Sequence, residues 1–199
     1  MPRPREFDMD DALDAAIGTF WTQGYEATSM TDLVAATGLH KGSIYKAFDD
    51  KHDLFMKSLT RYLDMAHRQT SRTFAEAPTP MDGLRAWLQG VVCLCSDQPV
   101  KRGCLAMNAA VELGPHDPQV RTLLENHHAR TSRMLTETIE AGQQSGQIRK
   151  DPTADQLAKS LFVFGAGLLG TSKVLCEAID AGEMVESALA MVCTGRQVS

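Results

Sequence analysis

The 199-residue chain lacks any long apolar run, and its first residues, Met-Pro-Arg-Pro-Arg-Glu-Phe, contain no hydrophobic signal core. A membrane-spanning helix needs at least about 18 apolar residues in succession, and a secretory signal needs an apolar segment after its basic start. These absences predict a cytoplasmic protein with no membrane partner. The chain also lacks alternating strand patterns, low-complexity tracts and internal repeats, so we predict an all-α fold.

Cysteine is scarce, and positive charge is not in excess. The five cysteines, an odd number, lie inside helical patterns, which favours free thiols over a disulfide framework. With 20 Lys and Arg against 25 Asp and Glu, the net charge is −5, which excludes a basic nucleic-acid coat. Positive charge is nevertheless concentrated in residues 37–48, which hold two lysines and His40 and no acid. So small a cationic footprint predicts few phosphate contacts per subunit and a need for a second copy.

Residues 29–48 carry the signals of two short helices joined by a tight turn. Ser29 is a favourable N-cap, and Asp32 three residues later can complete a capping box. Gly38 supplies the left-handed residue that ends the first helix. The pattern therefore predicts a helix that begins after Ser29, ends before Gly38 and turns directly into a second helix.

The second helix, over about 41–48, is predicted to have two chemically different faces. Ile44 and Phe48 are four residues apart and share an apolar face. Gly42 and Lys46 point the other way, with hydroxyl-bearing residues on the flanks. A helix of this kind can pack its apolar side on a core while its polar side contacts the DNA backbone and the major groove.

Helical spacing of apolar residues continues through the rest of the chain. We predict a helix-turn-helix head of three helices in residues 1–50 and a C-terminal domain in residues 51–199, coupled by the helix that follows residue 50. The helices predicted outside the turn motif cover residues 8–23, 51–74, 80–96, 102–113, 117–144, 153–180 and 183–194.

The N-terminal pattern reads Gly24-Tyr25-x-x-Thr28-Ser29-Met30-x-Asp32-Leu33, then Gly38-x-x-x-Gly42-x-Ile44-Tyr45-x-x-Phe48-x-x-Lys51-x-x-Leu54. It resembles the TetR-family repressor signature along its whole length, about the first 60 residues. The resemblance implies an Ω-like homodimer with about nine helices per chain. It implies that the head binds a near-palindromic DNA operator, and that the larger domain binds a small-molecule effector. The dimer would form through the last two long helices, at about 153–194.

The resemblance also implies which residues contact DNA. The helix start at Ser29 would bind phosphate, Lys41 and Ser43 would reach base edges, and Lys51 would clamp the backbone. One departure is Ala47, where many members carry a histidine. The alternative for Tyr45 is a half-buried aromatic residue of the core. The alternative for Lys51 is a solvated surface charge. The DNA-binding residues predicted in this way are Thr28, Ser29, Thr31, His40, Lys41, Gly42, Ser43, Tyr45, Lys46 and Lys51.

A second resemblance lies in the C-terminal part, where Gly103-Cys104-Leu105 precedes Glu112-Leu-x-Pro-x-Asp. It is similar to a sub-branch in which some members sense electrophiles or oxidants through the cysteine at the Cys104 position. Lys101, Arg102 and a place in the first turn of a helix would favour the reactive thiolate. A small buried hydrophobic side chain is the alternative for this cysteine. The ligand or sensor residues predicted here, each with a structural role as the alternative, are Trp87, Cys104, Met107, Asn108, Glu112, Phe162 and Leu168.

Two further motifs are rejected by their context. Gly165-Ala-Gly167-Leu-Leu-Gly170 matches the dinucleotide-binding pattern G-x-G-x-x-G, but it lies in one continuous predicted helix without partner strands. Its small residues favour close helix approach at a dimer seam instead. Cys93 and Cys95, considered with the histidine pair at 127–128 as a soft-metal site, diverge by about 200° around a helix and cannot easily share one ion. We predict no metal, no cofactor and no enzymatic activity.

These patterns favour a ligand- or redox-responsive transcriptional repressor that a small effector releases from its operator. The effector would favour a head spacing that no longer matches successive major grooves about 34 Å apart. One alternative is a thiol-based sensor of electrophiles or oxidants that acts through Cys104 rather than through a reversible ligand. Another is a DNA-binding or helical scaffold protein without any effector response.

Overall fold

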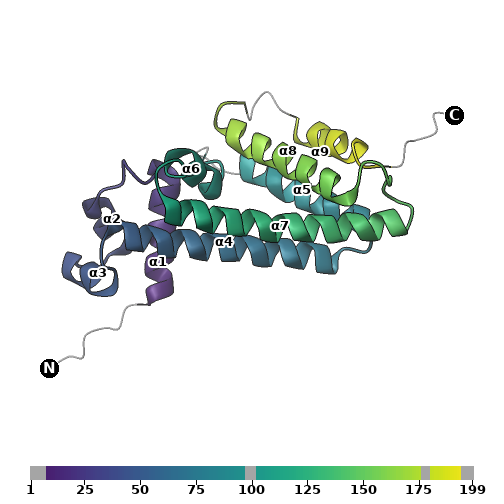
Figure 1. The fold of residues 1–199 in the computed structure, drawn as a ribbon. Coiled ribbons are helices and arrows are strands. Elements are labelled where there is room, and N and C mark those ends of the chain that lie inside the picture. Colours follow the sequence, from purple (N-terminus) through teal and green to yellow (C-terminus); the bar gives the residue numbers. More distant parts are fainter. Residues whose placement is uncertain (1–7, 97–101, 176–179, 194–199) are drawn as a thin grey trace.

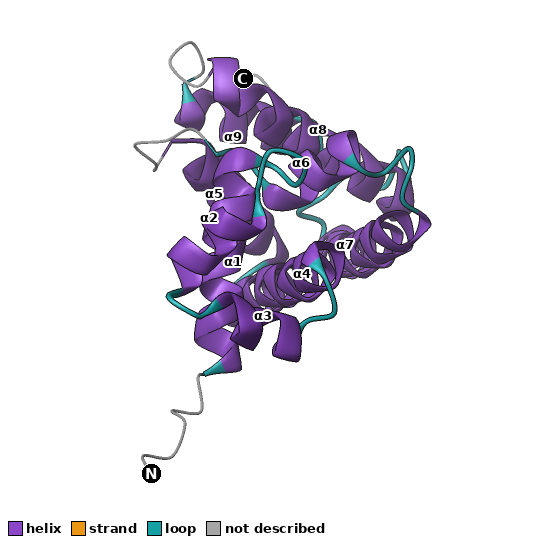
Figure 2. Cartoon of the chain, turned by 90° about the vertical axis from the view of Figure 1, so that its left-hand side faces the viewer, coloured by secondary structure: helices purple, strands orange, loops and turns teal. Residues whose placement is uncertain are grey.

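The structure, a computed structural model, describes residues 8–96, 102–175 and 180–193 (Figure 1). These residues form nine α-helices and no strand beyond an isolated bridge between Ile148 and Cys193, which confirms the all-α prediction (Figure 2). None of the helices in this part of the chain is long and apolar enough to cross a membrane. The helices are α1 (Met9–Gln23), α2 (Met30–Thr37), α3 (Lys41–Ala47), α4 (Lys51–Glu76), α5 (Pro80–Ser96), α6 (Leu105–Glu112), α7 (Pro118–Gln144), α8 (Ala154–Leu175) and α9 (Ala181–Ala190).

Helices α1, α2 and α3 form a small head at one end of the molecule, packed on the beginning of α4 (Figure 1). Their apolar residues join a buried core that we call the head cluster, in which Phe20, Leu33, Ile44 and Phe48 are each at most 2 % exposed. The rings of Phe20 and Phe55 meet edge to face with their centroids 5.0 Å apart, a favoured aromatic geometry. The head is therefore anchored to α4 by aromatic packing.

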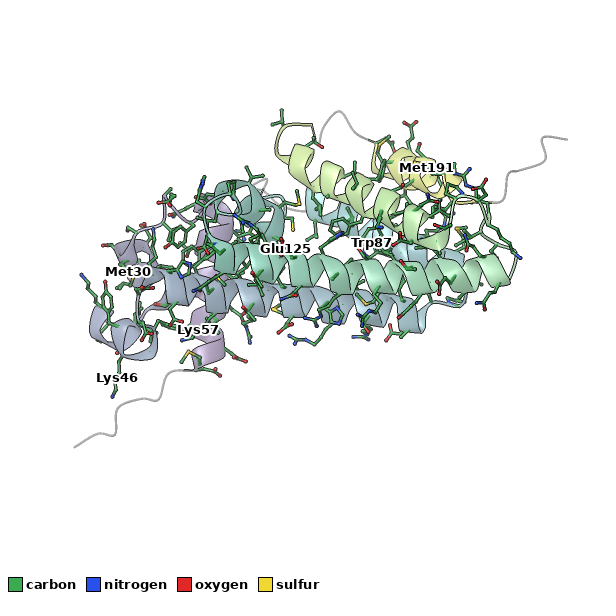
Figure 3. All side chains as sticks on the ribbon, in the orientation of Figure 1. Met30, Lys46, Lys57, Trp87, Glu125 and Met191 are labelled. Atoms are coloured by element: carbon green, nitrogen blue, oxygen red, sulfur yellow. The ribbon has the colours of Figure 1, made fainter. Side chains whose placement is uncertain are left out.

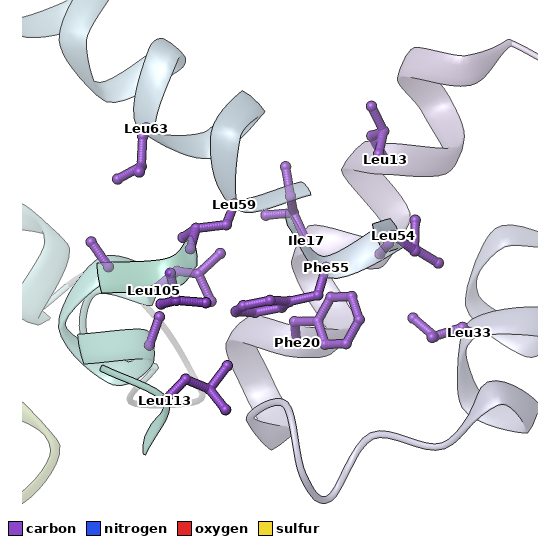
Figure 4. Packing of buried hydrophobic residues seen from close by; sticks show 14 of the residues in the cluster. Leu13, Ile17, Phe20, Leu33, Leu54, Phe55, Leu59, Leu63, Leu105 and Leu113 are labelled. Atoms are coloured by element: carbon purple, nitrogen blue, oxygen red, sulfur yellow. The ribbon is translucent and has the colours of Figure 1, made fainter. Parts of the chain in front are cut away.

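The head cluster also takes in part of the C-terminal region. Leu105 and Leu113, at the two ends of the α6 segment, are buried in it, and Figure 4 shows both side chains on the side of α6 that faces the rings of Phe20 and Phe55. The predicted domain boundary at residue 50 coincides with Asp50, the N-cap of α4. The head cluster contains buried apolar residues from both sides of residue 50.

A second core, which we call the body cluster, lies toward the other end of the molecule and joins α5, α7, α8 and α9. Helices α4 and α7 lie side by side along the molecule (Figure 1). The most deeply buried members of the body cluster are Leu84, Leu88, Leu135, Ile139, Ala158, Leu161 and Ala188.

Several helix ends differ from the sequence prediction. Helix α6 begins at Leu105 rather than at residue 102, because Gly103 has a φ of 65°, a left-handed conformation that interrupts a right-handed helix. Helix α9 begins before residue 183 because the Asp180 side chain caps it by accepting a hydrogen bond from the Glu183 N–H. It ends at Ala190 instead of 194, and α4 extends to Glu76 instead of 74. The predicted continuation of α8 over 176–179 lies outside the described residues.

Candidate nucleic-acid interface

The outer side of α3 is exposed and polar. His40, Lys41, Gly42, Tyr45 and Lys46 are all exposed, and the tyrosine keeps 45 % of its surface accessible. The apolar residues of the same segment are buried in the head cluster, and Figure 3 shows the lysine at position 46 directed away from the body of the molecule. We call these five residues, together with the half-buried Ser43, the α3 surface.

The α3 surface carries positive charge without a compensating acid on its own helix. Its first turn has no acidic residue, and Lys46 lies in its last turn. The Lys41 ammonium lies 5.8 Å from the centroid of the Tyr45 ring, within the range of cation–π attraction. An ammonium beside an exposed phenol offers both charge and a hydroxyl donor, which are the groups that bind phosphate oxygens.

The N-terminus of α2 is capped as the sequence predicts. Ser29 Oγ accepts a hydrogen bond from the Asp32 N–H at 3.2 Å, and the Asp32 carboxylate accepts one from the Ser29 N–H at 2.8 Å. The Ser29 hydroxyl also donates to this carboxylate, and these bonds, the hydroxyl's first, hold the pKa of Asp32 below its usual value. The Ser29 side chain is thus engaged in the cap, while Thr31 in the same turn is exposed.

The side chains of Thr28 and Lys51 contact the turn between α1 and α2. Thr28 is 1 % exposed, and its hydroxyl donates to the Gly24 carbonyl at 2.6 Å. The Lys51 ammonium donates to the carbonyls of Tyr25 and Thr28 at 3.0 and 3.1 Å and lies 4.2 Å from the centre of the Tyr25 ring. Both side chains therefore stabilise the turn between α1 and α2 through hydrogen bonds to its backbone carbonyls.

Cys104 is buried at the contact between α6, α4 and α1. Its Sγ lies 3.5 Å from the hydroxyl of Tyr62, whose ring meets that of Trp21 edge to face at 5.1 Å. The Trp21 indole N–H donates to the Gly103 carbonyl at 3.0 Å. Burial, with the neighbouring thiol as a smaller cause, raises the pKa of Tyr62 well above its usual value. The phenol therefore stays protonated and can donate to the sulfur.

The surroundings of this thiol differ from the sequence prediction. Cys104 is the N-cap of α6 and lies one residue before its first turn. Lys101 lies outside the described residues, and the Arg102 carbonyl accepts a hydrogen bond from the Asn108 side chain at 3.1 Å. Cys104 and Cys193 are free thiols, as predicted, and Cys93 is exposed.

The other predicted ligand residues fall into two groups. Met107 packs against the head cluster, whereas Trp87, Phe162 and Leu168 belong to or pack against the body cluster. Trp87 is half-buried on α5 (Figure 3). A shallow depression at the start of α7 contains none of these residues and is lined by Pro118, Gln119, Thr122, Leu123 and Asn126. The structure thus divides the predicted ligand residues between the two cores.

Glu112, predicted as a ligand residue, contacts the head in the structure. Its two carboxylate oxygens accept hydrogen bonds from the backbone N–H groups of Tyr25 at 2.9 Å and Glu26 at 2.8 Å. The partners are 87 and 86 residues apart in the chain. No local sequence signal joins positions so distant, so sequence reasoning missed this contact.

The glycine motif and the proposed soft-metal residues can each be located in part in the structure. The glycine motif lies within the single helix α8, where a Cβ at Gly165 would approach Trp87 of the same chain at 3.3 Å, while Gly167 and Gly170 face open space. Close approach at Gly165 is therefore made within the chain. Among the side chains that the structure describes, no three His, Cys, Asp or Glu residues are grouped as metal ligands would be.

Comparison with known proteins identifies similar chains in both parts of the sequence. Residues 12–56 match the family described as bacterial regulatory proteins, tetR family, and residues 80–188 match the tetracyclin repressor-like C-terminal domain. The HTH-type transcriptional repressor ComR of Escherichia coli (strain K12) is 32 % identical over 160 residues, which cover 80 % of this chain and 76 % of ComR. The repressor DhaR of Mycobacterium sp. (strain GP1) is 29 % identical over 78 % of this chain and 77 % of its own. A cysteine mutant of the TetR family regulator CifR, complexed with 26-bp operator DNA, superposes with a TM-score of 0.81 at 29 % identity, covering 96 % of this chain and all of CifR.

Proposed function

Because the chain belongs to the TetR family of bacterial transcriptional regulators, we propose that it is a homodimeric repressor whose α3 surface binds a near-palindromic operator. The observation that supports this best is the α3 surface itself, which is exposed, cationic and backed by buried apolar residues. Thr31 and the N–H groups at the start of α2 would add phosphate contacts. Thr28 and Lys51 would support the turn that presents them.

Selection of duplex DNA from a random pool by the purified chain tests this proposal. We expect enrichment of sequences with two inverted half-sites whose centres are about one helical turn, or a multiple of it, apart. Enrichment of single half-sites would contradict the dimeric mode. An absence of any sequence preference would contradict operator binding altogether.

The exposed side of α8 supports the homodimer. Val163 and Val174 are 68 % and 80 % exposed, and Gly167 and Gly170 leave open space beside the helix. Positions 163, 167, 170 and 174 follow a helical spacing of three and four residues, so they share one face of α8, and an exposed apolar helix face is typical of protein interfaces. We expect sedimentation velocity to show a dimer and Val163→Glu to shift it toward monomer. A wild-type chain that sediments as a monomer at all concentrations would contradict the proposal.

The position of Cys104 between α6 and α4, rather than any activating charge, is the reason to propose this thiol as the place where an effector acts. The sulfur contacts Tyr62 on α4, and Tyr62 packs on Trp21 of the head, so an added group would displace a contact between α4 and the head. We propose an α,β-unsaturated carbonyl compound or quinone as the effector class. The thiolate sulfur bonds to the electrophilic carbon, the π electrons move toward the carbonyl, and solvent accepts the thiol proton and returns one to the adduct.

Mass spectrometry after mild electrophile treatment, paired with binding to the selected duplex, tests the thiol proposal. We expect one adduct on Cys104 and release of DNA in the wild type and in Cys93→Ser, a control at an exposed thiol. Cys104→Ser should keep its DNA under the same treatment. Release that survives Cys104→Ser would favour a reversible ligand instead, and a chain that no effector releases would favour a non-responsive DNA-binding protein.

A further inference from the structure

Helix α6 contacts the head at both of its ends. At its start, the Gly103 carbonyl accepts a hydrogen bond from the Trp21 indole N–H. At its end, the Glu112 carboxylate accepts one hydrogen bond on each oxygen from the backbone N–H groups of Tyr25 and Glu26. The helix between these contacts has eight residues, a length of about 12 Å, so both contacts belong to one short, stiff element.

The turn between α1 and α2 is shaped to receive this carboxylate. Gly24 has a φ of 84°, and a Cβ at this position would lie 3.0 Å from Glu112 Oε2. A side chain at Gly24 would therefore be strained by its backbone conformation and would also crowd the carboxylate. Hydrogen bonds between a carboxylate and backbone N–H groups are stronger than those between neutral groups.

The same turn is held from its other side by α4. Lys51 donates to the carbonyls of Tyr25 and Thr28, so the N–H groups of the turn bind a negative group on α6 while its carbonyls bind a positive group on α4. The Ser29 cap and the first turn of α2 follow immediately. The direction in which α2 and α3 leave the turn is thus fixed jointly by α4 and α6.

We propose that Glu112 is a positioning residue for operator binding, which holds the head at the orientation that lets both subunits reach their half-sites together. We call the Glu112 carboxylate and the N–H groups of Tyr25 and Glu26 the α6 latch. This inference rests on the proposed operator binding and adds a charged contact at the turn between α1 and α2 to the other connections of the head, which are the continuous helix α4, the Trp21–Gly103 hydrogen bond and the apolar packing of α6. Because Cys104 is the N-cap of α6 and Glu112 is its last residue, a displacement of the cysteine end of α6 moves the latch as well.

The test compares Glu112→Gln with Glu140→Gln, a matched change at an exposed position on α7. Glutamine keeps the size of the side chain but replaces one acceptor oxygen with a donor and removes the charge. We expect the amide proton resonances of Tyr25 and Glu26 to move upfield in Glu112→Gln while both variants remain folded dimers. Affinity for the duplex selected by the wild type should fall about tenfold in Glu112→Gln and stay unchanged in Glu140→Gln.

A series of duplexes with the half-site spacing lengthened or shortened by one base pair separates positioning from general weakening. The wild type should discriminate strongly against altered spacing, and Glu112→Gln should discriminate less, because its heads are less firmly oriented. Glu112→Asp, which keeps the charge on a shorter side chain, should lie between the two and serves as the folded substitute if the glutamine variant does not fold. Equal affinity and equal spacing discrimination in a folded Glu112 variant would overturn the latch. A wild type that selects no sequence would instead overturn the proposed function.

Discussion

The head cluster and the body cluster differ in the parts of the sequence that contribute their residues. The body cluster is built from α5, α7, α8 and α9, all of which follow residue 76, whereas the head cluster combines residues before position 50 with residues of α4, α6 and α7. Apolar packing within the body cluster therefore stabilises one region, while packing within the head cluster also joins helices α1, α2 and α3 to the rest of the molecule. A change in the head cluster is expected to affect both stability and operator binding.

Helix α6 also makes polar contacts with the head. Helix α6 contributes Leu105 to the head cluster and Glu112 to the turn between α1 and α2. The head is thus in contact with the segment that carries Cys104, which lies beside Tyr62 on α4. An event at this cysteine has a short physical path to the head, through side chains that already touch.

The largest expected effect is that of Phe20→Ala in the head cluster. Phe20 is fully buried and its ring packs on Phe55, so its removal should reduce the free energy of unfolding by about 3–5 kcal/mol. Chemical denaturation followed by circular dichroism measures this change. Val111→Ala, at a residue 77 % exposed on α6, should stay within about 0.5 kcal/mol of the wild type. Equal effects of the two substitutions would contradict the importance of the head cluster.

A smaller effect is expected from Lys51→Met, which keeps most of the side-chain volume and removes the ammonium. Two hydrogen bonds to turn carbonyls are lost, so the free energy of unfolding should fall by about 1–2 kcal/mol. Operator affinity should fall with it, because the turn leads into α2. The salt dependence of binding should keep its slope. A slope reduced by about one would show that the ammonium contacts a DNA phosphate instead.

The smallest effect concerns pH and a pair of histidines between α4 and α7. Burial, followed by the Arg130 charge, lowers the pKa of His127 below 6.5, and the same causes lower that of His67. Because the unfolded chain then binds protons more readily, these residues contribute stability that is present above pH 6.5 and lost as pH falls through their folded pKa values.

His127→Gln should therefore reduce the loss of stability between pH 7.5 and pH 5.5, measured by urea denaturation at each pH. His116→Gln, at an exposed histidine after α6, is the matched control and should leave that loss unchanged. An identical pH dependence in wild type and His127→Gln would contradict a role for this half-buried pair.

Local features of the fold were predictable from the sequence, because the interactions that produce them span only a few residues. Ser29 and Asp32 form their capping box, Gly38 adopts the left-handed conformation that ends α2, and Gly24 ends α1. The start of α6 was misplaced because nothing in the sequence distinguishes Gly103 in a left-handed conformation from a glycine inside a helix.

The candidate site was predictable only where it depends on residues close together in the sequence. The α3 surface follows from helical periodicity over a few residues, and its exposure agrees with that pattern. The contacts of Lys51 and Glu112 with the turn at Tyr25 depend on tertiary packing across 26 and 87 residues. One sequence shows that these side chains are charged, but their partners become known only when the helices are placed in space.

The most direct test of the account is the salt dependence of binding to the selected duplex by wild type and by the double variant Lys41→Ala/Lys46→Ala. Both lysines are exposed on α3, so the double variant should keep its melting temperature and its dimer. Its affinity should fall on every sequence, and the slope of log K against log salt concentration should decrease by about two for each subunit bound. Unchanged affinity and slope in this folded variant would contradict binding of DNA through the α3 surface.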